Sequence, residues 1–198
     1  MNTPDLAIID YGGANLASVR TALARLQVNA VITLDQKLIK AARRVLLPGV
    51  GASDPAMTRL RNLGLDELIP SLTQPLMGIC LGMQLLMQSS EEGRLPTLGV
   101  MAAQVERIHP TPTLTVPHMG WNQLDFDTPH PLLNNISAQS YVYFVHSYAI
   151  KPMAHTVATT CHGEHWSAMV VKDNFCGVQF HPERSSQVGA RILKNFLN

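Results

Sequence analysis

One cysteine of the chain stands where a thiol could act as a nucleophile. The stretch PLMGICLGMQ, residues 75–84, reads as a buried apolar strand that runs into a helix, with Cys80 between Gly78 and Gly82. Glycines at these two positions permit a nucleophile elbow, a tight strand-to-helix turn that lifts the central side chain clear of the sheet. The helix dipole would favour the thiolate, and the N–H of Leu81 would point at an oxyanion formed beside the sulfur. A cysteine that simply packs in the turn is the alternative reading.

A partner base for this thiol is found in the stretch GVQFHPERS, residues 177–185. If residues 180–183 are extended, side chains two apart point the same way, so Glu183 can orient the imidazole of His181 while its other nitrogen faces Cys80. A lone histidine after an apolar strand is more often a hydrogen-bonded core residue. The neighbouring glutamate and the elbow cysteine together favour the catalytic reading.

A third segment, Pro48-Gly-Val-Gly51, ends the apolar run RVLLPG. Open α/β sheets bind ligands at the carboxyl ends of their strands, and flexible glycine backbone there could supply a second N–H to an oxyanion. Read by itself, this segment is only a turn.

The elements that must position these groups alternate in the amino-terminal half. The runs LAIID, NAVITL, RRVLLPG and PLMGI are typical of strands, and helical patterns follow at residues 16–26 and 80–90. Such alternation indicates parallel βαβ units. Short β-rich runs separated by Pro, Gly and Asn fill residues 99–162, and an amphipathic helix closes the chain at 185–198. We therefore expect a single domain, residues 1–198, of α/β class, with a mixed, mostly parallel central sheet flanked by helices and a β-rich middle insertion.

Composition excludes several classes of partner. Fifteen basic and fourteen acidic residues give a net charge of +1, so there is no electrostatic case for a nucleic acid or an anionic membrane. No apolar run has the length of a membrane span, and the chain enters its first strand without a signal segment. Three cysteines are an odd count, which favours free thiols and a cytoplasmic location. Charged residues make up only 15% of the chain, against about 25% in an average protein, which favours a surface covered by another protein.

Two further motifs are weaker. CHGEH, residues 161–165, places potential metal ligands close together, but the central Gly163 between β-rich runs makes a hairpin turn the better reading, and we expect no metal. DYGGANL, residues 10–16, lacks the full spacing of a dinucleotide-binding loop, and no cofactor is expected.

Taken together, the elbow cysteine, the His-Pro-Glu segment and PGVG resemble the class I (triad) glutamine amidotransferase family over essentially the whole chain. The resemblance implies a flavodoxin-like fold and the hydrolysis of glutamine through a cysteine thioester. It places Cys80, His181 and Glu183 in the catalytic triad and assigns the oxyanion N–H groups to Val50 and Leu81. The glutamine site that it implies comprises Gln84, Gly49, Gly51, His146, Ser147 and Tyr148.

Within this family, the strings VPHMGWNQL at 116–124 and YFVHSY at 143–148 are similar to the glutaminase subunits of imidazole glycerol phosphate synthases, which serve histidine biosynthesis. Such subunits dock on a (β/α)8-barrel cyclase and pass ammonia to it. The resemblance puts Asn15, Trp121 and Tyr143 at that interface, where two half-buried aromatics and a turn are the plain structural alternative. A member serving another amidotransferase pathway, or a thiol redox sensor on the same fold, is the competing function.

Overall fold

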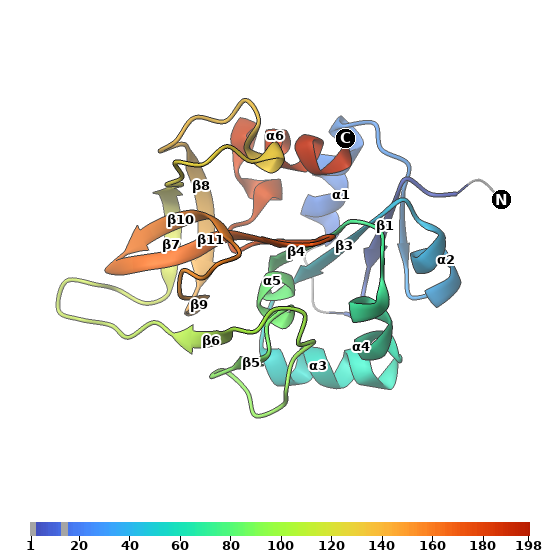
Figure 1. Ribbon diagram of the computed structural model, residues 1–198, viewed down its shortest axis with the longest axis horizontal. Helices are drawn as coiled ribbons and strands as arrows, with labels where there is room; N and C mark the ends of the chain where they lie inside the picture. Colours follow the sequence, from blue (N-terminus) through green and yellow to red (C-terminus); the bar gives the residue numbers. More distant parts are fainter. Residues whose placement is uncertain (1–2, 13–15) are drawn as a thin grey trace.

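The computed structural model describes residues 3–12 and 16–198 of the chain, and a seven-stranded sheet forms its centre (Figure 1). Five neighbouring strands are parallel, and two antiparallel strands extend one edge. In spatial order the strands are β10 (Thr156–His162), β11 (Glu164–Lys172), β12 (Phe175–Val178), β4 (Leu76–Cys80), β3 (Arg44–Gly49), β1 (Leu6–Ile9) and β2 (Ala30–Thr33). The mixed, mostly parallel sheet predicted from the sequence is therefore confirmed.

Helices cover both faces of this sheet because its strands are apolar on both sides, as in other parallel sheets. Leu6 and Ile8 of β1 pack into the same core as helices α1 (Leu16–Arg25) and α6 (Ser186–Leu197). The alternate residues Ala7 and Ile9 face the opposite core. The helices of that second core are α2 (Gln36–Ala41), α3 (Ser53–Asn62), α4 (Leu65–Leu68) and α5 (Leu81–Leu85), with the short 3-10 helix η1 (Ile69–Ser71) after α4.

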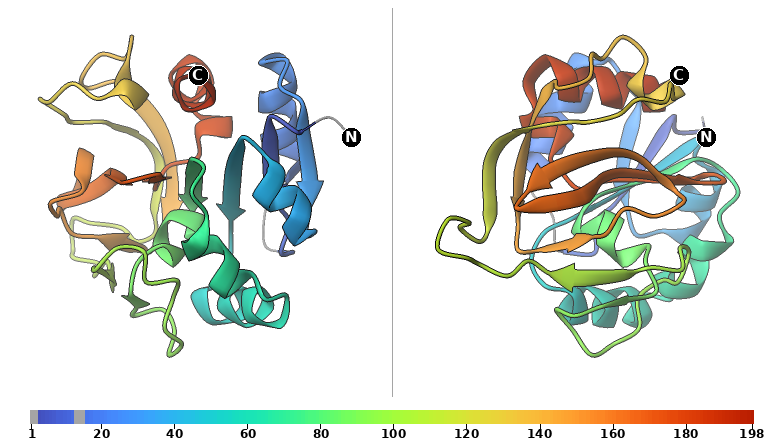
Figure 2. Two further views of the ribbon diagram at one scale, coloured as in Figure 1. Left: turned by 45° about the vertical axis from the view of Figure 1, so that its right-hand side comes forward. Right: turned by 60° about the vertical axis from the view of Figure 1, so that its left-hand side comes forward.

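The β-rich middle of the chain stays outside the central sheet except for β10. It forms a three-stranded sheet of β5 (Ser89–Ser90), β6 (Gln104–Arg107) and β9 (Tyr148–Ile150), and a two-stranded sheet of β7 (His118–Gln123) and β8 (Tyr141–His146). The 3-10 helix η2 (Pro131–Leu133) lies in the connection between β7 and β8. Figure 2 shows these segments gathered on the side of the molecule remote from β1 and β2.

The helix predicted over residues 80–90 is wrong in length, because α5 ends at Leu85. The carbonyls of Leu85, Leu86 and Met87 accept hydrogen bonds from Leu98, Met101 and Gly99 rather than from the following helical turn. The closing helix predicted at 185–198 is confirmed as α6. Among the described residues, no helix has the length and apolarity needed to cross a bilayer. The single-domain assignment of residues 1–198 stays a prediction.

Candidate active site

Cys80 is the last residue of β4, and α5 begins at the next residue. Its backbone has φ 53° and ψ −112°, a strained conformation for a residue with a side chain and one that nucleophile elbows adopt. A Cβ on Gly78 would lie 2.7 Å from the amide nitrogen of Met83, and a Cβ on Gly82 would overlap the carbonyl of Leu47 in β3. The two glycines therefore allow α5 to pack directly against the strands at the point where the chain turns.

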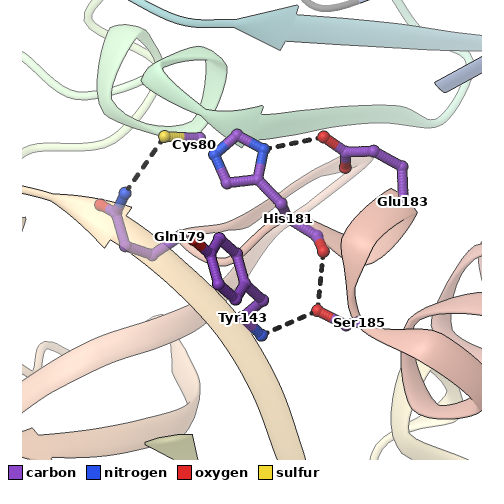
Figure 3. Close-up of polar contacts among 6 residues, drawn as sticks. All are labelled: Cys80, Tyr143, Gln179, His181, Glu183 and Ser185. Carbon is purple, nitrogen blue, oxygen red and sulfur yellow. Dashed lines mark hydrogen bonds and ion pairs between the residues drawn. The ribbon is translucent and has the colours of Figure 1, made fainter. Parts of the chain in front are cut away.

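The sheet brings His181 to the same edge as the thiol. Strand β12 runs parallel to β4, with Val178 paired to Ile79, so the residues that follow each strand come out side by side. In Figure 3 the ring of His181 lies between Cys80 and Glu183. Its Nδ1 is 2.8 Å from Oε1 of Glu183, while Nε2 is buried and makes no hydrogen bond within the described part of the chain.

The local conformation predicted for this segment is wrong. Residues 180–183 are not extended throughout, because Pro182–Arg184 form the 3-10 helix η3. The proline suits the first position of such a turn, where its missing N–H is not needed. The turn still carries Glu183 back to the Nδ1 side of His181, so the contact that was inferred from an extended strand arises from a tight turn.

Buried charges set the electrostatics around Cys80, His181 and Glu183. Burial on its own lowers the pKa of His181, but the adjoining Cys80 and Glu183 outweigh it and raise the pKa to about 10. The Glu183 side chain is only 3% exposed, so solvent screens its charge poorly. An imidazolium held against the sulfur stabilises a thiolate, which is the form of cysteine that attacks carbonyl carbon.

Strand β8 holds the histidine segment in place from the other side. The N–H of His181 donates to the carbonyl of Tyr143 at 2.9 Å, and the hydroxyl of Ser185 accepts from the N–H of Tyr143 and donates to the carbonyl of His181 (Figure 3). Ser185 is fully buried. The backbone of the base is thus fixed to the two-stranded sheet as well as to β12.

A cavity of about 420 Å³ opens over the thiol, a volume suited to a small molecule. Five of the six residues predicted to bind glutamine line it, and Gly49 does not. Gly49 lies beneath the wall, where an added Cβ would be 2.9 Å from the amide nitrogen of Gly82. The predicted residues that line the cavity are Val50, Gly51, Cys80, Leu81, Gln84, His146, Ser147, Tyr148, His181 and Glu183.

Several residues of the site were missed in the sequence: Pro117, Val145 and Arg184 line the cavity, and Glu92 and Gln179 add polar groups. Glu92 lines the cavity, and burial raises the pKa of its carboxyl. Gln179 is fully buried, and its Nε2 lies 3.8 Å from the sulfur of Cys80 (Figure 3), while its Oε1 accepts from Gln84. Gln179 had a usable signal, since it stands two residues before His181 and extended backbone up to that histidine places both side chains on one face.

The remaining predicted residues are placed as follows. The side chain of Trp121 is 52% exposed, and its ring packs edge-on against the half-buried Tyr143 with centroids 6.0 Å apart. Asn15 lies outside the described residues. CHGEH is the hairpin between β10 and β11, with Gly163 at its turn. The described residues contain no group of three or more His, Cys, Asp or Glu side chains that could hold a metal ion.

Comparison with known proteins agrees with this geometry. The family model for glutamine amidotransferase class-I matches residues 7–198. Proteins named imidazole glycerol phosphate synthase subunit HisH are 50% identical in Xylella fastidiosa (strain Temecula1) and 49% identical in Haemophilus influenzae (strain KW20), each over 98% of this chain and 96% of the relative.

Solved structures share the fold at low identity. A putative GMP synthase subunit from Thermoplasma acidophilum aligns with a TM-score of 0.75 and 19% identity, covering 100% of this chain and 94% of the other. The structure of PurLQS from Thermotoga maritima aligns with a TM-score of 0.70 and 17% identity, covering 100% and 99%. With a family model and half-identical relatives spanning almost all of its length, the chain belongs to the class-I glutamine amidotransferase family.

Proposed function

We propose that this chain is the glutaminase subunit of an imidazole glycerol phosphate synthase, hydrolysing glutamine to glutamate and ammonia for use by a partner protein. The observation that carries the proposal is the placement of Cys80, His181 and Glu183 along one wall of a cavity, with His181 bonded to Glu183 at 2.8 Å. The chain is 49–50% identical, over 98% of its length, to proteins named as subunits of this synthase, and this similarity supports the choice of pathway.

In the first half of the reaction, the Cys80 thiolate attacks the side-chain amide carbon of glutamine. The tetrahedral oxyanion accepts hydrogen bonds from the N–H groups that we assign to Leu81 and Val50. The imidazolium of His181 then gives its Nε2 proton to the departing nitrogen, and ammonia leaves a glutamyl thioester on the sulfur. Glu183 holds the Nδ1–H throughout, which fixes the ring orientation and stabilises its positive charge.

In the second half, His181 is neutral and removes a proton from water as the water attacks the thioester carbon. Collapse of the second tetrahedral intermediate releases glutamate and returns the sulfur as thiolate beside a charged imidazole. The Nε2 atom is suited to both roles, because it is buried and has no competing partner among the described residues.

The cavity also offers groups for the amino-acid end of glutamine. Both Nε2 hydrogens of Gln84 are used, one by the carbonyl of Tyr148 and one by Oε1 of Gln179, so its remaining polar atom is the acceptor Oε1. An acceptor together with the carboxylate of Glu92 favours a bound ammonium group. We assign the α-ammonium group of glutamine to this side of the cavity.

The partner that we propose is a (β/α)8-barrel cyclase, which would use the ammonia to form imidazole glycerol phosphate and aminoimidazole carboxamide ribotide. Large apolar side chains lie exposed on the two-stranded sheet: Met119, Trp121 and Tyr141, between 52% and 63% exposed. Exposed aromatics of this kind are typical of protein interfaces. A cytoplasmic location, and a partner role for Asn15, stay predictions.

Measurement of glutamate release from glutamine tests the proposal. We expect the complex with a barrel cyclase to release glutamate and form imidazole glycerol phosphate. The Cys80→Ala complex should lose the glutamine-dependent reaction and keep the reaction supported by added ammonium salt. An absence of glutamate release with and without the cyclase would refute the proposal, and reversible oxidation of Cys80 in that inactive chain would indicate the redox-sensor alternative instead.

A further inference from the structure

Two buried histidines behind the cavity form a hydrogen-bonded pair that the proposed chemistry does not use. His118 of β7 and His146 of β8 face each other in the antiparallel register, and Nδ1 of His118 lies 3.1 Å from Nε2 of His146. The two side chains are 4% and 6% exposed. His146 lines the cavity and His118 does not, so His118 lies behind His146 as seen from the substrate.

The contacts on either side fix which nitrogen of each ring carries the hydrogen. The carbonyl of Cys161 can only accept, so the Asn122 side-chain atom 2.8 Å from it must be the amide nitrogen. The second hydrogen of that nitrogen points to Nε2 of His118 at 3.1 Å, which makes this atom an acceptor. His118 therefore carries its hydrogen on Nδ1 and donates to His146.

The other end of this hydrogen-bond series, at Tyr148, requires the same direction of donation from His118 to His146. Nδ1 of His146 lies 2.8 Å from the carbonyl of Tyr148, which also can only accept. His146 must therefore hold its hydrogen on Nδ1 and accept at Nε2 from His118. Two independent carbonyls thus select one tautomer for each ring, and every bond in the series has one donor and one acceptor.

Packing and burial keep both rings in this neutral state. The ring of His118 is stacked between Phe144 and His162, with centroids 4.6 Å and 4.1 Å away. Burial, reinforced by the neighbouring histidines, lowers the pKa of His118 to about 3. Burial likewise lowers the pKa of His146 to about 4, against the opposing effect of its bond to Tyr148. A proton on either ring would place two donors face to face.

The series ends on the wall of the glutamine cavity. The carbonyl of Tyr148 accepts from His146 on one side and from Gln84 on the other, at 2.8 Å and 2.9 Å. This double acceptance holds the Tyr148 peptide and sets which atom of Gln84 is left for the substrate, because the other hydrogen of the same nitrogen is committed to Gln179.

We propose that His118 is a positioning residue for glutamine: by donating to His146 it locks the Tyr148 peptide, and through that peptide the acceptor that Gln84 presents in the cavity. This inference rests on the proposed glutaminase function. It assigns His118 to substrate binding rather than to bond breaking, since the series reaches Gln84 first. Beyond Gln84 it continues to the sulfur of Cys80 through Gln179, whose contact with that sulfur is long at 3.8 Å.

Two substitutions at His118 separate the hydrogen bond from the packing. His118→Phe keeps a flat ring in the stack and removes the donor, whereas His118→Asn can place an amide nitrogen near the position of Nδ1 and donate again. In the complex with the cyclase, we expect His118→Phe to raise the KM for glutamine about tenfold or more, which is about 1.4 kcal/mol or more, with kcat within about threefold of the parent. His118→Asn should return KM to within about threefold.

A third variant reverses the direction of the bonds without touching either histidine. Asn122→Asp replaces a donor to Nε2 of His118 by an acceptor, so a neutral His118 carries its hydrogen on Nε2 and leaves two lone pairs facing each other at His146. We expect a rise in KM like that of His118→Phe. The matched control is His162→Phe, which keeps the second stacked ring and lies outside the series, and its KM should stay within about twofold.

Imidazole nitrogen spectra of the full chain supply a readout that does not depend on activity. Long-range ¹H–¹⁵N spectra of the parent should show both rings as neutral Nδ1–H tautomers, and Asn122→Asp should convert His118 to the Nε2–H form. An unchanged KM in folded His118→Phe and Asn122→Asp, an effect confined to kcat, or an Nε2–H tautomer of His118 in the parent would overturn the inference. A parent complex that releases no glutamate would instead refute the proposed function, and the spectra would still decide whether the bonds run as described.

Discussion

Exchanging Gln179 for glutamate puts a titratable group against the nucleophile and makes the proposed site testable by pH. In Gln179→Glu an oxygen takes the place of Nε2, 3.8 Å from the sulfur of Cys80, in a position with no solvent exposure. Two unit charges about 4 Å apart repel by roughly 4 kcal/mol at an effective dielectric constant of about 20. That repulsion corresponds to about 3 pH units, on top of the ordinary value of about 4.3 for a glutamate carboxyl.

The introduced carboxyl should therefore hold its proton up to about neutral pH. In that state it has the shape of the amide, donates to the sulfur and accepts from Gln84, so glutaminase activity should stay close to that of the parent. The sign of the change is fixed by the raised pKa: the neutral, active form prevails below it, and the charged form prevails above it. Activity should fall as pH rises through this value, because a carboxylate beside the sulfur opposes the thiolate.

The assay is kcat/KM for glutamine in the cyclase complex across neutral and mildly alkaline pH. Gln179→Met is the control, because it removes both hydrogen bonds without adding a charge. It should lower activity at all pH values, because the Gln84 amide loses the acceptor that orients it in the cavity, and it should keep the shape of the parental pH profile. A Gln179→Glu profile that matches the parent would refute the close contact between Gln179 and the reactive sulfur.

Three further predictions follow from the same geometry. Cys80→Ala should lower the pKa of His181, since it removes one of the two groups that raise it, and titration of the ring by NMR measures this. Ser185→Ala should lower unfolding free energy by about 1–3 kcal/mol, seen in urea titrations, because a buried N–H of β8 loses its acceptor. Gly82→Ala should cost about 1–3 kcal/mol through overpacking against β3, seen in the same urea titrations; an unchanged unfolding free energy would contradict the close approach of α5.

Sequence patterns predicted the parts of the fold that depend on local periodicity. Alternation of apolar strands and amphipathic helices is a short-range signal, so the strands that end at Gly49 and Cys80 and the closing helix α6 were found. The grouping of the middle strands into two small sheets was not predicted, because pairing between β6 and β9, or β7 and β8, depends on tertiary contacts that no local pattern encodes.

The candidate site divides in the same way. Cys80 and His181 were found because glycine spacing and the His-Pro-Glu string constrain the backbone near them. Glu92 was missed because a glutamate in a polar loop is unremarkable until the fold places it in the cavity wall. Gln179 was missed although its spacing of two residues from His181 indicated a shared face, because no local pattern shows that this face meets the sulfur. The turn η3 was missed for another reason: the same contact between His181 and Glu183 can be reached from an extended or a turned backbone.

The place of β12 in the central sheet has a consequence for how activity is acquired during folding. β12 lies between β4 and β11, so it joins the parallel strands formed by the first half of the chain to the β10–β11 hairpin. Its partner β4 is separated from it by about a hundred residues, as the pairing of Phe175 with Leu76 shows, and contacts that close such long loops form slowly. Cys80 has its base beside it only once β12 has inserted. A chain folded up to that step is therefore catalytically silent, and the return of glutaminase activity after dilution from denaturant reports the joining of the two halves of the sheet.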